Sequence, residues 1–246
     1  MMTRGKVAAV FRTVVWSVGV SAALGLQASA ETAGLGGTEL PEDFFGKSES
    51  MEAPVGHNPE PGFPIFPRVG NLQAPVSIEY FYSSDCESCA DASRALFTLL
   101  SQGEDVNVTF HGVGTSEEAY VDAIGEVVLF SIDPKLFELF HFGSMMAFDQ
   151  GKTLNSVTFM GEIAAQAGQV DVLQARMEHY EEWTASLTLN SEILSALEAE
   201  NLPVFVINDV KYEGFASLED LVGAIRIANG EELMQQGVVP GAGQGR

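Results

Sequence analysis

The chain has 246 residues, with 34 acidic and 12 basic side chains and a formal net charge of −22. A chain this acidic repels phosphate backbones, which argues against nucleic acid as a partner. No segment reaches the roughly 20 consecutive apolar residues that a membrane-spanning helix needs, so a transmembrane protein is not expected either.

The first thirty residues have the pattern of an export signal. Three basic residues (Arg4, Lys6 and Arg12) precede a mostly apolar run at 14–26, and small residues at 28–30 form a cleavage site. We predict that 1–30 is a signal peptide, with an uncleaved anchor as the alternative. The mature protein would then be periplasmic, without stable membrane insertion. It would keep 9 basic against 34 acidic side chains, a net charge of −25.

Two flanking segments differ in composition from the rest of the chain. Residues 31–68 are rich in glycine, proline and acidic side chains and have no sustained hydrophobic period, which predicts an extended or disordered leader. Residues 229–246 form a Gly-rich C-terminal tail. The intervening 69–228 are long enough for one domain with a substantial hydrophobic core.

The domain opens with a strand followed by a helix. Residues 76–82 alternate in the manner of a largely buried strand. After two cysteines at 86 and 89, the apolar residues Ala92, Leu96 and Leu99 recur at helical spacing. A second strand is expected at 106–110.

The rest of the domain is predicted to be a helical block followed by two strands and a helix. Residues 116–197 are helical in pattern almost throughout, with Ser116, Asp133 and Asp171 as candidate N-caps. Strand character returns at 204–207, and a turn leads to a second run at 211–215. A last helix is expected to start at Ser217.

Cys86 and Cys89 are the only cysteines in the chain. Their position between a strand and a helix places the first thiol at a helix N-terminus, where free N–H groups and the helix dipole stabilise a thiolate. Two cysteines at this spacing can also close a disulfide and so carry two electrons. A thiolate attacks disulfides, so the pair predicts thiol–disulfide exchange through a redox-active disulfide, with no other cofactor.

Two separated segments carry a resemblance to a known family. The stretch at 74–81 that leads into Cys86 and Cys89 and the Leu-Pro-Val-Phe-Val-Ile-Asn run at 202–208 resemble the exported DsbA-like thiol–disulfide oxidoreductases. The likeness covers about 69–228. It implies an α/β thioredoxin-like fold, a central mixed sheet flanked by helices, with a helical subdomain inserted at about 116–197.

The resemblance also implies a function. It predicts a dithiol–disulfide oxidoreductase that exchanges disulfides with unfolded or cysteine-containing exported proteins and is recycled by a redox partner. Cys86 would attack and Cys89 would resolve, with Glu87 and Ser88 forming the active-site loop. Pro203 would be a cis proline beside the cysteines, and Leu202 would contribute to the substrate groove. A trans proline at the start of a strand is the alternative.

The chain departs from the family pattern at two places that bear on mechanism. Glu87-Ser88 stands where strongly oxidising relatives have Pro-His, and Asp85 and Asp91 add further acidic charge around Cys86. Like charges disfavour a thiolate, so we predict a Cys86 pKa that is less depressed than in strong oxidants. Family members often bury an acid on the strand, six positions before the first cysteine, and this sequence has Tyr80 at that position. Glu79, one residue earlier, is a possible proton relay if a bulge turns it inward, and otherwise a solvated or salt-bridged strand residue.

Two other classes of function remain open from the sequence. A closed zinc site would need two ligands besides the cysteines, and the four histidines (His57, His111, His141 and His179) show no ligand-like spacing, so no metal is expected. A thioredoxin-fold chaperone or adaptor that binds peptides with little redox catalysis is the main alternative. Met145, Met146 and Phe148 could then line an apolar peptide groove, or else be core.

Overall fold

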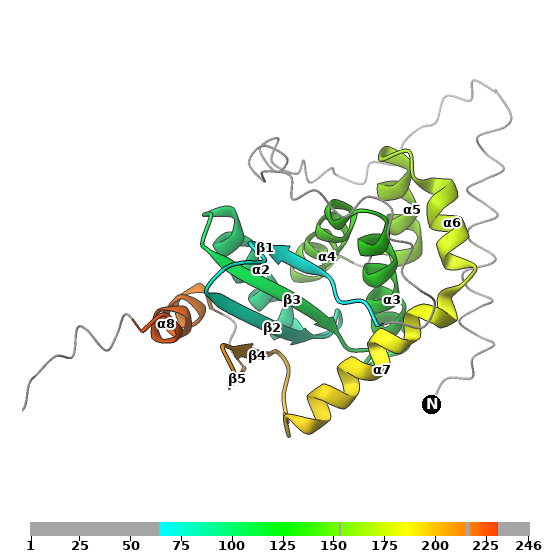
Figure 1. Cartoon of the computed structure of the whole chain (residues 1–246). Helices are drawn as coiled ribbons and strands as arrows, with labels where there is room; N and C mark the ends of the chain where they lie inside the picture. Colours follow the sequence, from blue (N-terminus) through cyan, green and yellow to red (C-terminus); the bar gives the residue numbers. More distant parts are fainter. Residues whose placement is uncertain (1–63, 153, 215–216, 231–246) are drawn as a thin grey trace, which may run out of the picture.

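The computed structural model describes residues 64–152, 154–214 and 217–230. The predicted signal peptide at 1–30, most of the predicted leader and nearly all of the C-terminal tail lie outside the described residues. Within them, a sheet is flanked by helices, and a group of helices lies to one side of it (Figure 1). The predicted thioredoxin-like α/β fold class is confirmed.

The described part of the chain contains one five-stranded mixed sheet with the strand order β1-β3-β2-β4-β5. β2 pairs in parallel with β3, and every other neighbouring pair is antiparallel. The strands are β1 (Arg68–Gly70), β2 (Val76–Tyr82), β3 (Val106–Gly112), β4 (Val204–Ile207) and β5 (Val210–Glu213). β2 therefore lies at the centre of the sheet, immediately before the cysteines in sequence.

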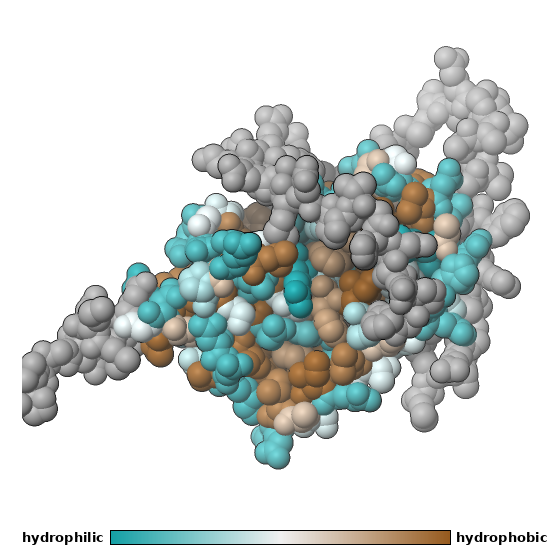
Figure 2. Space-filling view, viewed as in Figure 1, coloured by the Kyte–Doolittle hydropathy of each residue, from teal (hydrophilic) through white to brown (hydrophobic). Residues whose placement is uncertain are grey.

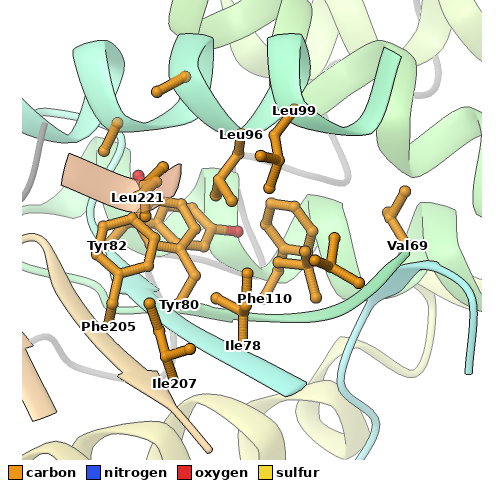
Figure 3. Packing of buried hydrophobic residues seen from close by; sticks show 14 of the residues in the cluster. Val69, Ile78, Tyr80, Tyr82, Leu96, Leu99, Phe110, Phe205, Ile207 and Leu221 are labelled. Carbon is orange, nitrogen blue, oxygen red and sulfur yellow. The ribbon is translucent and has the colours of Figure 1, made fainter. Parts of the chain in front are cut away.

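One face of the sheet packs against α2 (Glu87–Ser101) and α8 (Leu218–Ala228). The strand period of two sends Ile78, Tyr80 and Tyr82 to this face, where all three are almost completely buried. Figure 3 shows them beneath α2, together with Leu96 and Leu99 from the helix. This core holds α2 against β2 and so positions the start of the helix.

Residues 117–196 form the helical subdomain that the sequence predicts. Its helices are α3 (Glu117–Ile132), α4 (Pro134–Asp149), α5 (Ser156–Gln166), α6 (Val170–Met177) and α7 (Tyr180–Ala196). They enclose a second hydrophobic core of their own. Ser116 and Asp133 cap α3 and α4 as predicted. The prediction for Asp171 is wrong, because α6 begins at Val170 with Gln169 as its N-cap, two residues before the predicted cap.

The chain already packs on the domain before the predicted boundary at residue 69. The Ile65 N–H donates to the Ser186 hydroxyl at 2.8 Å, the Phe66 ring lies 4.9 Å from that of His111, and the Pro67 carbonyl accepts from the Phe110 N–H. Residues 65–67 thus connect β3 with α7, so the C-terminal end of the predicted leader at 31–68 is extended and packs on the domain. Two apolar side chains outweigh the surrounding Gly-Pro composition here.

α7 lies on the opposite side of β3 from α2, and its residues Ser186 and Asn190 are buried there. Figure 2 shows apolar residues gathered on this side of the molecule, around the C-terminal half of α7. Ile193, Leu194 and Leu197 are partly exposed in that region. None of the helices in the described residues is both long enough and apolar enough to cross a bilayer.

The close contact between Gly70 of β1 and the backbone of β3 can be tested by substitution. Gly70 has φ +98°, and a Cβ there would meet the Val106 carbonyl oxygen at 2.2 Å. We expect Gly70→Ala to lower the free energy of unfolding by about 3 kcal/mol, because backbone rather than a flexible side chain must move. Urea unfolding followed by circular dichroism measures the loss.

Gly103→Ala is the matched control. Gly103 also has a positive φ, +75°, but no other atom lies within 4 Å of the added Cβ. Its cost should be about 1 kcal/mol, from backbone strain alone. Equal losses at the two glycines would show that the contact with Val106 is unimportant.

Candidate active site

Cys86 and Cys89 form a disulfide at the start of α2, with an S–S distance of 2.12 Å and a Cα–Cα distance of 5.1 Å. Cys86 is the N-cap residue of α2 and is partly exposed, whereas Cys89 is completely buried beneath the helix. The two sulfurs therefore differ in access. An incoming thiolate can reach Cys86, while Cys89 is shielded by the core.

The first turn of α2 directs a hydrogen-bond donor at the outer sulfur. The Cys89 N–H lies 3.2 Å from the Cys86 Sγ. Cys86 occupies the N-cap position of α2, where the helix dipole favours negative charge. Helix N-terminal donors of this kind favour an anion, by at most about 2 kcal/mol. Once the disulfide opens, the same geometry favours a thiolate at Cys86.

The second predicted segment lies beside the cysteines. The Ser88 hydroxyl donates to the Leu202 carbonyl at 3.2 Å and lies 3.4 Å from the Cys86 Sγ. The Leu202–Pro203 peptide bond is cis, the isomer that the family resemblance implies. Pro203 is buried and Leu202 half-buried, with Leu202 and Cys86 both packed against the same core. Residues 114 positions apart thus share one site.

Three carboxylates lie close to Cys86 in sequence, and the structure holds two of them in place. Partial burial opposes the charge on Asp85, but hydrogen bonds, chiefly from Ser83 and Thr115, outweigh it and lower the Asp85 pKa. Asp91 pairs with Arg94 at 3.1 Å. Glu87, the first residue of α2, is exposed. Asp85 is therefore a fixed negative charge directly before the outer cysteine.

A chain of buried polar groups, not expected from the sequence, lies beneath Cys89. The Tyr80 hydroxyl lies 2.8 Å from the Cys89 carbonyl oxygen and 3.0 Å from the Ser93 hydroxyl. Ser93 in turn lies 3.2 Å from Nε2 of His141 on α4. The sequence contained a signal, because Ser93 follows Cys89 by one helical turn and His141 interrupts an apolar helix face.

The chain of polar groups continues into the helical subdomain. Nδ1 of His141 lies 2.7 Å from a carboxylate oxygen of Glu126 on α3, and the second oxygen of Glu126 accepts a short hydrogen bond from Tyr82. His141 is fully buried and Glu126 is 4% exposed. From the sequence, His141 was considered only as a metal ligand, and its spacing from the other histidines gave no indication of these contacts.

Glu79 is not brought to the cysteines. The regular register of β2 against β3 and β4 has no bulge, so Glu79 points to the face opposite Tyr80. There its carboxylate lies 2.5 Å from Nε2 of His111, whose Nδ1 lies 2.8 Å from Asn190 of α7. The predicted proton-relay position is therefore wrong, and Glu79 is the salt-bridged strand residue of the alternative reading.

The described histidines and cysteines do not gather into a metal site. His111 and His141 lie in the two separate pairs above, and His179 is exposed beside Glu182. No group of three or more His, Cys, Asp or Glu side chains with metal-binding geometry occurs in residues 64–152, 154–214 and 217–230. His57 lies outside them.

A mainly apolar groove of about 300 Å³ runs between α2 and α4. Phe97, Phe142, Met145 and Met146 contribute to its lining, and an ion pair between Arg94 and Asp149 spans the two helices. Met145 is buried in the core, as one of its two predicted roles requires, and Phe148 is exposed. The groove starts at Ala90, directly after the buried cysteine.

The chain matches known proteins at two levels. A family model described as thioredoxin matches residues 66–226, more than half of the chain. Among solved structures, a thioredoxin-like oxidoreductase from Silicibacter pomeroyi is 23% identical, with a TM-score of 0.55, and the match covers 67% of this chain and 92% of that one. No curated protein matches the chain significantly.

Two further solved structures share the fold. Oxidised BdbD from Bacillus subtilis is 19% identical, with a TM-score of 0.55 and coverage of 66% of this chain and 92% of that one. The thiol-disulfide exchange protein α-DsbA2 from Wolbachia pipientis is 16% identical, with a TM-score of 0.57 and coverage of 68% and 87%. These structures confirm the resemblance to DsbA-like proteins at the level of the fold. The family model shows that the chain belongs to the thioredoxin family.

Proposed function

We propose that this protein is an exported dithiol–disulfide oxidoreductase that acts on cysteine-containing proteins in the periplasm. The observation that carries the proposal is the unequal burial of its cysteine pair, with Cys86 accessible at a helix N-terminus and Cys89 buried behind it. Such a pair can exchange with an outside thiol at one sulfur only. The predicted signal peptide at 1–30 supports the location.

In this proposal the two cysteines have different roles. A substrate thiolate attacks the Cys86 sulfur, a mixed disulfide forms, and Cys89 leaves; in the opposite direction the Cys86 thiolate attacks a substrate disulfide and Cys89 then displaces the substrate. Leu202 is half-buried, and its carbonyl accepts the hydrogen bond from Ser88. In this proposal an extended substrate peptide pairs with the backbone at Leu202, alongside the cysteines. A separate redox partner restores the resting state of the pair.

Substitution of each cysteine separates these roles. Cys89→Ser should accumulate a mixed disulfide with a disulfide-containing substrate protein, because the Cys86 thiolate still attacks the substrate disulfide but no Cys89 thiol remains to displace the captured substrate. Cys86→Ser should neither form the adduct nor catalyse disulfide exchange. Non-reducing electrophoresis and mass spectrometry detect the adduct, and insulin reduction with oxidative refolding measures catalysis. Equal catalysis by wild type and Cys86→Ser would leave a peptide-binding adaptor as the better description.

The carboxylates around Cys86 should make the disulfide more reducing. In the double variant Asp85→Asn/Glu87→Gln, the Cys86 pKa should fall by about one unit, worth about 1.4 kcal/mol, because two like charges no longer oppose the thiolate. A more stable thiolate stabilises the reduced form, so the reduction potential should rise by about 30 mV at neutral pH. Thiolate absorbance against pH and equilibration with glutathione measure the two quantities.

Glu181→Gln/Glu182→Gln is the matched control, since both residues lie in the first turn of another helix, α7. It removes the same formal charge and should leave the Cys86 pKa and the potential unchanged. A shift of the same size in the control would mean that net charge, and not proximity to Cys86, sets the potential.

A further inference from the structure

The segment that joins α7 to β4, residues 198–203, carries the backbone that the proposed function assigns to substrate peptides. It has neither helical nor strand structure, and Glu198 at its start has a positive φ of 51°. Within the described part of the chain, residues 199–202 make no hydrogen bond to another backbone group. Side-chain contacts must therefore hold Leu202 in place, because no backbone ladder fixes it.

Lys211 of β5 holds the first part of this segment. Its ammonium group donates to the Leu197 carbonyl at 2.9 Å and lies 3.5 Å from the Glu198 carbonyl. Leu197 is the C-cap residue of α7. A cation at this position satisfies carbonyls that have no partner within the helix, and it meets the negative end of the helix dipole.

Glu213, two residues further along β5, holds the second part. One of its carboxylate oxygens accepts from Lys211 at 2.7 Å, and the other accepts from the Glu200 N–H at 3.3 Å. The hydrogen bond from Lys211, followed by those from the backbone N–H groups of Glu200 and Asn201, lowers the pKa of Glu213. The carboxylate is therefore charged at neutral pH and faces the two N–H groups directly before Leu202.

The pair is more than an ordinary surface ion pair. The side chains of Lys211 and Glu213 are 35% and 27% exposed, and an isolated pair at that exposure contributes little to stability. This pair, however, places its ammonium on carbonyls and its carboxylate on N–H groups of the same segment. Beyond it, Ser88 donates to the Leu202 carbonyl and the Gly214 N–H donates to the Pro203 carbonyl. The backbone is thus held step by step as far as the cysteines.

We propose that Lys211 and Glu213 form a clamp that keeps residues 198–202 in the conformation that binds a substrate peptide, an inference that rests on the function proposed above. Both are positioning residues, because they act through the backbone that leads to Leu202. A protein whose binding-competent conformation is only partly populated binds its ligand more weakly by that fraction. Loss of the clamp should therefore weaken peptide binding and leave the reactivity of the cysteine pair unchanged.

The order of the two charges distinguishes a clamp from a simple ion pair. The exchanged variant Lys211→Glu/Glu213→Lys keeps the net charge and can still form an ion pair. It turns a carboxylate toward the carbonyls at the end of α7 and an ammonium toward the N–H groups of Glu200 and Asn201. Groups of like polarity then meet at both ends, so the exchanged variant should bind peptide no better than Glu213→Gln.

The test measures peptide affinity without requiring catalysis. The whole oxidised protein is titrated against a fluorescent, extended peptide that has serine in place of its central cysteine, and anisotropy gives the Kd. Lys211→Met, Glu213→Gln and the exchanged variant should each raise the Kd about tenfold. Amide hydrogen exchange at 198–202 should become faster in all three, because the segment opens more often. Dithiothreitol should open their disulfide at the wild-type rate, since a small thiol does not need the peptide site.

Asn71→Ala is the matched control at the opposite edge of the sheet. Asn71 follows β1, and its side chain also ties an exposed connecting segment, by donating to Asp105 at 2.7 Å and accepting from the Gln73 N–H at 3.0 Å. Asn71→Ala should keep the wild-type Kd and the wild-type exchange at 198–202.

Three results would overturn the clamp. They are wild-type affinity in the exchanged variant, an equal loss of affinity in Asn71→Ala, and a wild-type protein that does not bind the peptide at all. If the exchanged variant does not fold, Glu213→Gln and Lys211→Met decide the question, and wild-type affinity in both would count against the clamp.

Single turnovers of the reduced protein with a disulfide-containing peptide separate this inference from the proposed function. The clamp variants should raise the KM about tenfold and leave the maximal rate unchanged. If the wild type reduces no peptide while the Kd values behave as expected, the clamp stands and the proposed function fails. If the wild type reduces the peptide and all variants share its KM and Kd, the function stands and the clamp fails.

Discussion

The packing of α2 on the centre of the sheet determines the geometry of the whole site. Leu96 and Leu99 of the helix cover the face of β2 that presents Ile78, Tyr80 and Tyr82 (Figure 3). Each fully buried apolar side chain contributes about 1.5–3 kcal/mol, far more than one helix-terminus interaction. The core therefore decides where the first turn of α2 lies, and the electrostatics of that turn follow. Cys89 is buried and Cys86 left accessible for the same reason.

The central strand carries different chemistry on its two faces. Toward α2 it presents tyrosines whose hydroxyls join His141 and Glu126. Toward α7 it presents Glu79, which joins His111 and Asn190. The two His–Glu pairs are similar in composition, but only one lies on the side of the cysteines. A period of two along an extended strand is enough to separate them.

The helical subdomain completes the site instead of merely covering the sheet. It supplies His141 from α4 and Glu126 from α3, so the polar groups under Cys89 come from β2, α2 and the inserted helices together. A buried polar group without a partner costs about 1–3 kcal/mol, comparable to the gain from burying a large apolar side chain. Such a cluster is tolerated only when its members satisfy one another, which ties the position of the subdomain to that of α2.

The sequence by itself determined the local features of this protein. Hydrophobic periodicity indicated the central strand, the helix after it and the long helical block. The two cysteines at a strand–helix junction indicated thiol–disulfide chemistry. Both signals could be read because they depend on residues close together in the chain. Capping by Ser116 and Asp133 was predictable for the same reason. The family resemblance placed Leu202 and Pro203 beside the cysteines. Only the tertiary structure decided where the other distant side chains lie: that Glu79 faces away, and that His141 lies beneath Cys89. These contacts depend on strand register and helix packing. Local residue spacing does not predict which side chains tens of residues apart in sequence come into contact.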